Sequence, residues 1–272
     1  MIIFIVSVCV KNKIHLNQLI RCINSIRKFH KNEIIYLIND SHEKFYDDIL
    51  YVASSNININ ILESINKGSA DQQVFKFILE INEIKDNTKC VIIQDSMILN
   101  KELSKINEID DIKFIWHFTN HRLHWDIIEE PQCVFNIDNK ILTHSDLIKF
   151  IIKTNYDDKF YKFALEKMEK KNEWCGCFGN CCIIKKTFLK KIEKFTNFVD
   201  MFALSTDNRQ RRANESIFSL LCHYYLPNYD FEKSYDGLYY DGVNSFVPFS
   251  TNFDNLHWCT IHDFFSKISF NR

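Results

Sequence analysis

Short, almost continuous apolar runs alternate with longer amphipathic segments through the first hundred residues. A continuous run is typical of a strand buried on both faces, whereas apolar residues recurring every three or four positions are typical of a helix. The pattern predicts strands at 2–10, 34–38, 57–62 and 91–93, of which 57–62 alternates between apolar and polar residues, and helices at 16–30, 45–52 and 69–84. Strand and helix in alternation favour an α/β fold, in which helices cover both faces of a parallel sheet.

The second half of the chain is less regular. The same patterns predict strands at 113–118 and 181–184, and helices at 145–153, 157–170, 186–195 and 207–225. After Leu226 the periodicity is weak, and we expect this stretch, rich in Tyr, Asp, Gly and Asn, to close over the rest of the protein. Since neither a repeat nor a linker is found, we interpret residues 1–272 as one domain, built from a 1–100 half and a 101–272 half.

Composition and charge narrow the class of protein. The chain has 34 basic and 35 acidic residues, a net charge of −1 and 46% hydrophobic residues, which is typical of a globular protein and not of a disordered one. A near-neutral chain is not held to nucleic acid or to an anionic membrane by bulk charge. We therefore expect no nucleic-acid partner.

The start of the chain is apolar from Met1 to Val10. This run is too short to span a bilayer, and it has neither a preceding basic residue nor a small-residue cleavage site after it. We interpret it as a buried first strand, and we expect no transmembrane segment and a cytoplasmic location.

Ten cysteines occur in the chain, and without a secretion signal we expect them to be reduced. The densest group is formed by four cysteines, in Cys175-Gly176-Cys177 and Cys181-Cys182. Their spacing matches no common zinc module, so packed thiols in a strand and turn are favoured over a zinc site.

Polar residues follow three of the predicted strands. Asp40-Ser41 ends the second strand, Asn66-Lys67-Gly68-Ser69 follows the third and opens a helix, and Gln94-Asp95-Ser96 ends the fourth. In a parallel sheet these ends meet at one edge, where ligands bind. A lysine and a helix N-terminus favour phosphate, and a carboxylate can hold Mg²⁺ or Mn²⁺. Each motif alone is also a common turn or cap, and their order is what indicates a site.

The usual glycine-rich and nucleophile motifs are missing. No GxGxxG, no GxxxxGK[ST] and no GxSxG occurs in the chain. The common signatures of dinucleotide binding, P-loop ATP hydrolysis and α/β-hydrolase chemistry are therefore excluded.

The order of the strand-end motifs resembles that of nucleotide-sugar glycosyltransferases of the GT-A fold, near the large inverting family 2-type group. The resemblance spans residues 2 to 225, and the matching pieces are IIFIVSVCV, IIYLIND, NKGSADQQ, IIQDSMIL, WCGCFGNCCIIKKTFL and RRANESIF. It implies one GT-A-type domain with a mostly parallel, twisted central sheet flanked by helices. It also implies transfer of a sugar from a nucleoside-diphosphate sugar, a UDP-sugar being favoured, to a hydroxyl of a glycan or protein acceptor with inversion.

The resemblance assigns a donor site. It implies that Val8, Val10, Asp40 and Lys67 hold the nucleotide. Gln94-Asp95-Ser96 corresponds to the DXD-type motif that binds the metal and the diphosphate. This motif has one acid here instead of two, which leaves the dependence on Mn²⁺ or Mg²⁺ open. Asp95 would be the metal ligand from this segment, aided by a C-terminal histidine such as His257 or His262.

The resemblance also assigns an acceptor side. Trp174 and Phe178 would stack on sugar rings, or else belong to the core, and Gly179 with Gly176 would permit close approach or unusual backbone angles.

The catalytic base implied by the resemblance is Glu215, with Asp207 as the alternative. Glu215 lies about 200° around the helix from Ala213 at roughly 100° per residue, and so off the apolar stripe. It is expected to face either solvent or the cleft. The basic run Arg209, Arg211 and Arg212 is interpreted as a solvated helix face rather than a diphosphate contact.

Two other functions stay open. A nucleotidyltransferase that makes the nucleotide sugar shares a similar sheet, but it needs a Gly-rich, Arg-containing loop after the first strand, where this chain has Cys9-Val10-Lys11-Asn12-Lys13. A catalytically silent nucleotide-sugar- or glycan-binding protein on the same fold is motivated by the single acid at Asp95.

Overall fold

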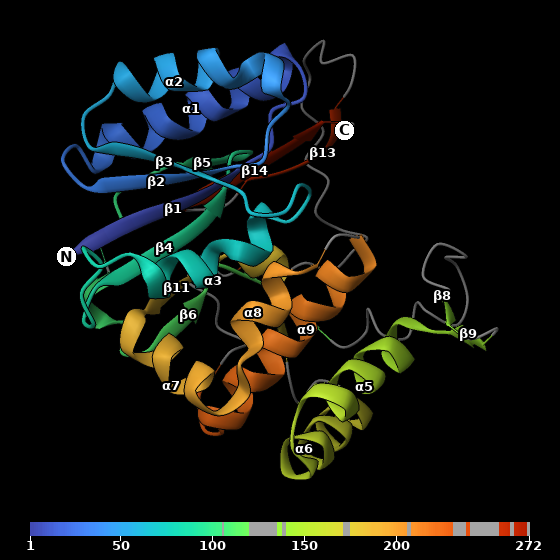
Figure 1. The fold of residues 1–272 in the computed structure, drawn as a ribbon. Coiled ribbons are helices and arrows are strands. Elements are labelled where there is room, and N and C mark those ends of the chain that lie inside the picture. Colours follow the sequence, from blue (N-terminus) through green and yellow to red (C-terminus); the bar gives the residue numbers. More distant parts are fainter. Residues whose placement is uncertain are drawn as a thin grey trace.

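The computed structural model describes residues 1–104, 106–119, 135–137, 140–170, 175–205, 208–230, 238–239, 256–261 and 264–270. It has an α/β fold around a six-stranded sheet in the order β3-β2-β1-β4-β11-β6 (Figure 1). The strands of this sheet are β1 (Ile2–Val8), β2 (Ile34–Asn39), β3 (Ile59–Glu63), β4 (Lys89–Gln94), β11 (Cys182–Lys185) and β6 (Ile112–Phe114). The first four are parallel, and β11 runs antiparallel to both of its neighbours. The predicted α/β fold with a mostly parallel central sheet is confirmed.

Helices cover both faces of this sheet (Figure 1). One face carries α1 (Lys13–Phe29), the short η1 (Glu43–Phe45) and α2 (Tyr46–Ser54), and the other carries α3 (Ala70–Glu80), α7 (Lys186–Thr196), α8 (Phe198–Ala203) and α9 (Asn208–Tyr225). Successive side chains of β1 alternate between two core clusters, with Ile3 and Ile5 in one and Phe4 and Val6 in the other. Alternation along a strand places neighbouring residues on opposite faces, which explains why the strand is apolar at each position from Ile2 to Val6.

Smaller sheets and helices complete the described part of the chain. The C-terminal β14 (Phe265–Phe270) pairs antiparallel with β13 (Leu256–Ile261) and with β5 (Met97–Leu99), directly after β4. A second sheet has the order β10 (Cys175–Cys177), β7 (Trp116–Thr119) and β12 (Leu238–Tyr239). The remaining elements are the pair β8 (Phe135–Ile137) and β9 (Lys140–Leu142), the helices α5 (His144–Asn155) and α6 (Asp158–Glu169), and the short turns η2 (Ile106–Glu108) and η5 (Phe178–Asn180).

Three predicted elements need correction. The strand expected at 113–118 is two strands in two sheets, β6 and β7, and the buried Ile115 between them donates its N–H to the Cys181 carbonyl. The helix expected to reach residue 84 ends at Glu80, because Ile81 has an extended backbone. The first strand ends at Val8 rather than Val10, whose N–H bonds to Ser41 Oγ at 2.8 Å.

The division into two halves stays a prediction, although β11 and β6 from beyond residue 100 join the same sheet as β1 to β4. Within the described residues, no helix is both long enough and apolar enough to cross a membrane.

Cysteines 177, 181 and 182 are free and buried, as expected for packed thiols in a strand and turn. In the part of the chain that the structure describes, no group of three or more His, Cys, Asp or Glu side chains is arranged to hold a metal ion.

Candidate functional site

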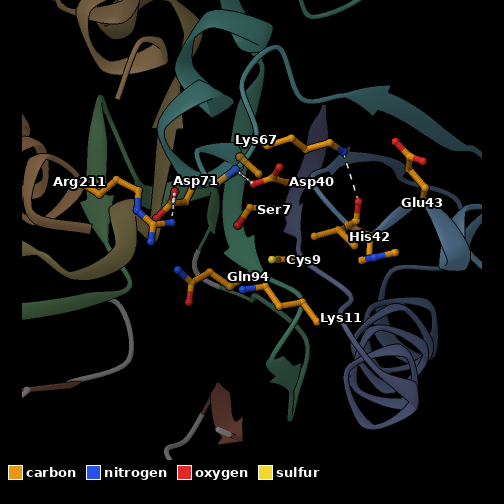
Figure 2. A pocket seen from close by; sticks show the side chains of 14 residues that line it. Ser7, Cys9, Lys11, Asp40, His42, Glu43, Lys67, Asp71, Gln94 and Arg211 are labelled. Carbon is orange, nitrogen blue, oxygen red and sulfur yellow. Dashed lines mark hydrogen bonds and ion pairs between the residues drawn. The ribbon is translucent and has the colours of Figure 1, made fainter. Parts of the chain in front are cut away.

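A cavity of about 840 Å³ opens where the strand order of the main sheet reverses (Figure 2). The chain runs outward from β1 to β2 and β3, then crosses back to β4 on the other side of β1. At such a switch point the loops after neighbouring strands diverge and leave a crevice beyond their carboxyl ends. Val8, Asp40, Lys67 and Gln94, four of the predicted donor contacts, line this cavity together.

Asp40 is a buried carboxylate in the wall of the cavity. Its side chain is 8% exposed, and Oδ2 accepts the Gly68 N–H at 2.6 Å while Oδ1 is buried without a hydrogen-bond partner. Burial raises the pKa of this carboxyl above its ordinary value, although the N–H groups of Gly68 and Ala70 and the charge on Lys67 act in the opposite direction. A buried acceptor of this kind suits a ligand that donates a hydrogen bond.

The segment between β3 and α3 holds Lys67 over the cavity. Gln73, which is fully buried, accepts the Ile65 N–H at 2.7 Å and donates to the Asn66 carbonyl at 3.0 Å. Gly68 takes a left-handed φ of 86°, which glycine tolerates at little cost. Lys67 Nζ then donates to the Ser41 carbonyl at 3.2 Å, so its charge lies beside Asp40.

The first turn of α3 also faces the cavity. The N-cap residue Ser69 does not cap this helix with its own side chain, since its hydroxyl donates to the Asn66 carbonyl instead, whereas the Ala70 N–H bonds to the Asp40 carboxylate. Ala70 and Asp71 of the first turn line the cavity. A helix N-terminus carries partial positive charge, which favours an anionic ligand.

The Gln94-Asp95-Ser96 segment is arranged differently from the expected metal site. Gln94 lines the cavity, and its Oε1 accepts a hydrogen bond from Lys267 Nζ. Asp95 is 3% exposed and its Oδ2 accepts the Cys9 N–H at 2.7 Å. A divalent cation of this class needs about six or more oxygen ligands. The carboxylate of Asp95, the single acid, already accepts a backbone N–H, and the side-chain oxygen of Gln94 already accepts a hydrogen bond from an ammonium group. The described residues of this segment therefore do not fit Mn²⁺ or Mg²⁺.

Four other predicted donor-site residues do not reach the cavity or cannot be placed. Val10 and Ser96 are buried and are not among its lining residues, and the Ser96 carbonyl accepts the Ile268 N–H. His262 lies outside the described residues, and of His257 only the backbone, in β13, is described.

Helix α9 changes two expectations. Arg211 lines the cavity and its Nη1 lies 3.6 Å from Asp71 Oδ1, so the solvated interpretation of the basic run is wrong for this residue, although Arg212 is exposed. Glu215 is only 9% exposed and therefore does not face solvent. The apolar-stripe argument failed because α9 contacts α5, α6, α7 and β10 and is buried around its whole circumference from Ala213 to Cys222.

Glu215 lies four residues after Arg211 on α9, so the two side chains share one face of the helix. It is not among the residues that line the cavity. Asp207, the alternative base, lies outside the described residues.

The acceptor-side residues are only partly described. Trp174 and the side chain of Phe178 lie outside the described residues. Gly179 has φ +60°, and a Cβ built there would lie 2.8 Å from Gln94 Nε2. Glycine at this position therefore lets η5 approach the cavity wall.

Other lining residues were not singled out from the sequence. Figure 2 shows them around the same cavity as Asp40 and Gln94. They are Ser7, Cys9, Lys11, His42, Glu43 and Asp71. Each lies within a few residues of a predicted strand end or helix start, and this proximity is the signal that could have identified them.

No protein-family model and no curated protein matches the chain. Among solved structures, the bifunctional glycosyltransferase WbbM is 12% identical over 81% of this chain, with a TM-score of 0.40, and the match spans 37% of WbbM. The galactosyltransferase LgtC, solved with donor and acceptor sugar analogs, is 8% identical over 80% of this chain and 70% of its own, with a TM-score of 0.40. Core-mannan synthase A from Aspergillus fumigatus, in an Mn/GDP form, is 8% identical over 80% of this chain and 68% of its own, with a TM-score of 0.39.

The similarity to GT-A glycosyltransferases expected from the sequence is thus also found among solved structures. Because the identities and TM-scores are low, the likeness by itself assigns neither activity nor ligand to this chain.

Proposed function

We propose that this protein is a glycosyltransferase that moves a sugar from a nucleoside-diphosphate sugar to an acceptor hydroxyl. One observation carries the proposal: the buried carboxylate of Asp40 and the charged side chains of Lys67 and Arg211 line one cavity at the switch point of the sheet. A nucleoside offers hydrogen-bond donors and a diphosphate carries negative charge, so one ligand satisfies both ends. The cavity of about 840 Å³ falls in the range of small-molecule sites, about 300–1,000 Å³.

The nucleoside is assigned to the Asp40 end of the cavity. Asp40 Oδ1 accepts a hydrogen bond from a nucleobase N–H or a ribose hydroxyl, and Val8 with Ser7 forms the wall beside it. The diphosphate lies against Lys67, Arg211 and the first turn of α3, where a helix N-terminus attracts anions. We favour a UDP-sugar as donor and a glycan or protein hydroxyl as acceptor.

The chemical step needs a base for the acceptor hydroxyl, and we assign it to Glu215. Arg211, one turn earlier on the same face of α9, lines the cavity, whereas Glu215 is buried and is not among the lining residues. Burial of a carboxylate away from bulk water favours its use as a base. Attack opposite to the leaving diphosphate gives inversion.

The first experiment measures nucleotide binding. Titration calorimetry of the purified protein with UDP, GDP, CDP and ADP is expected to find at least one ligand, and Asp40→Asn is expected to weaken it about tenfold, since a hydrogen bond to a charged group contributes roughly 1.5–3 kcal/mol. Asp47→Asn on the exposed surface of α2 is the matched control and leaves affinity unchanged. A folded wild-type protein that binds none of these nucleotides contradicts the proposal.

The stability of Asp40→Asn separates lost binding from misfolding. Burial raises the folded-state pKa of Asp40 above its ordinary value of 3.8, so the folded protein holds this proton more tightly than the unfolded chain. The wild type therefore loses stability as pH rises from 3.8 through the folded-state pKa. Asparagine carries no charge, so the variant is expected to melt at a higher temperature than the wild type at pH 7, with the difference disappearing below about pH 3.8.

A catalytically silent binding protein is the second candidate, and the single acid at Asp95, already engaged by Cys9, favours it. Turnover separates the two. Release of nucleoside diphosphate from a nucleotide sugar is expected for the wild type, and Glu215→Gln is expected to lower the rate about 10²–10⁴-fold with nucleotide affinity retained. Equal background release from both proteins would support the silent protein.

A further inference from the structure

A buried lysine stands beside the cavity although it comes from the C-terminal strand. Lys267 on β14 is 6% exposed, and its Nζ donates to Gln94 Oε1. Gln94 is the member of the Gln94-Asp95-Ser96 segment that lines the cavity. A positive charge therefore lies directly behind the end of β4, at the segment that the sequence resemblance matches to a metal-binding motif.

The fold holds this lysine firmly. Strand β14 pairs antiparallel with β5, and Lys267 lies opposite Met97 in that register. The next residue, Ile268, donates its N–H to the Ser96 carbonyl at 3.0 Å and accepts a hydrogen bond from Gln18 on α1. Because the backbone beside Lys267 is bonded to the Gln94-Asp95-Ser96 segment itself, the ammonium is positioned before any ligand arrives.

Two further observations connect Lys267 with the reacting end of the cavity. Burial raises the pKa of the Cys181 thiol, and among the nearby charges Lys267 lowers this pKa while Glu215 and Asp71 raise it, so all three charged groups lie in the neighbourhood of this thiol. Gly179 lies two residues before Cys181, and its lack of a side chain leaves room for the side chain of Gln94. The segment cannot offer a cation the oxygen ligands it needs, because Asp95 Oδ2 and Gln94 Oε1 already accept hydrogen bonds.

We propose that Lys267 takes the place of a divalent cation: it holds Gln94 in the cavity wall, and its charge, directly behind that wall, stabilises the diphosphate of the donor. The inference rests on the proposed glycosyl transfer. In that step the acceptor oxygen forms a bond to the anomeric carbon, the bond from that carbon to the diphosphate oxygen breaks, and its electron pair leaves with the diphosphate. Glu215 receives the acceptor proton. Lys267 stabilises the negative charge that develops on the leaving group.

The test measures nucleotide affinity in the presence of EDTA. Titration of the wild type with UDP, GDP, CDP and ADP in EDTA is expected to find a ligand, and added Mn²⁺ is expected to leave its affinity unchanged. Lys267→Met is expected to lower the affinity for that nucleoside diphosphate about tenfold or more and to leave the affinity for the matching nucleoside unchanged. Lys267→Arg, which keeps the charge, is expected to recover most of the affinity.

The matched control is Lys101→Met. Lys101 Nζ lies 4.1 Å from the ring of Phe264, next to β14, so this variant removes the same charge near the same sheet without touching Gln94. It is expected to bind like the wild type. Circular dichroism and thermal melting establish that each variant is folded.

The outcomes separate the two proposals. Wild-type binding only with Mn²⁺, or unchanged binding by folded Lys267→Met, overturns the role of Lys267 and leaves the glycosyltransferase intact. Equal loss of nucleoside and diphosphate in Lys267→Met assigns the lysine a purely structural role and also overturns it. If Lys267→Met does not fold, the EDTA comparison and Lys267→Arg decide. No nucleotide bound under any condition overturns the proposed function and this inference together.

Discussion

At the scale of single residues, the site depends on contacts between positions far apart in the sequence. Gly179 in η5 and Gln94 at the end of β4 touch so closely that a Cβ on Gly179 would lie 2.8 Å from Gln94 Nε2. Lys267 contacts the same Gln94 from the other end of the chain. The orientation of one amide therefore depends on a glycine and a lysine at once, and a change at either is felt at the cavity wall.

Gly179→Ala tests this dependence. The left-handed backbone alone costs a non-glycine residue about 1–2 kcal/mol, and the contact with Gln94 adds to it. The free energy of unfolding, measured in urea, is expected to fall by at least that amount. In the double variant Gly179→Ala with Gln94→Ala the steric part is relieved, so the two changes should be non-additive. Simple additivity would mean that the alanine does not press on Gln94.

At the scale of elements, the segment between β3 and α3 owes its shape to one buried glutamine. Gln73 donates to the Asn66 carbonyl and to Ser64 Oγ and accepts the Ile65 N–H, and Asn66 in turn donates to the Ala203 carbonyl on α8. These bonds tie the segment both to its own helix and to a distant one. Lys67 is held over the cavity because its two neighbours in the chain are held.

Gln73→Leu is expected to lower the free energy of unfolding by about 1–3 kcal/mol, because the Ile65 N–H and the Asn66 carbonyl lose a buried partner. Nucleotide affinity should fall as well, since Lys67 is no longer held in place. Urea unfolding and calorimetry measure the two effects. Glu80→Gln, exposed on the last turn of the same helix, is the control, and a change there within about 0.5 kcal/mol is expected. If Gln73→Leu behaves like this control, the hydrogen bonds do not shape the segment.

At the scale of the whole molecule, the order of the strands creates the site. Because β1 is flanked by β2 on one side and β4 on the other, the ends of β1 and β4 and the segment after β2 converge. The antiparallel β11 lies between β4 and β6, so the segment that carries Gly179 is brought to Gln94. Pairing of β14 with β5 brings Lys267 to the same place.

The sequence by itself determined the elements and the residues at their ends. Nearly unbroken apolar runs identified β1, β2 and β4, because strands buried on both faces admit few polar residues, and an alternating pattern identified β3. Asp40, Lys67 and Gln94 could be chosen as site residues because they lie at or shortly after the ends of these strands, and the carboxyl ends of parallel strands share one edge.

Tertiary structure decided what periodicity and spacing do not encode. Glu215 was expected to face either solvent or the cleft because it lies off the apolar stripe, but α9 is buried on all sides around it, and this burial depends on elements distant in the chain. Arg211 was assigned to solvent, yet the same helix aims it at the cavity. The single acid of Gln94-Asp95-Ser96 pointed to a weak metal site, and only the return of β14 brought an ammonium to it, across 173 residues of sequence. A local pattern reports which face of an element is apolar, whereas the partner of a polar group is set by packing between elements that the pattern does not connect.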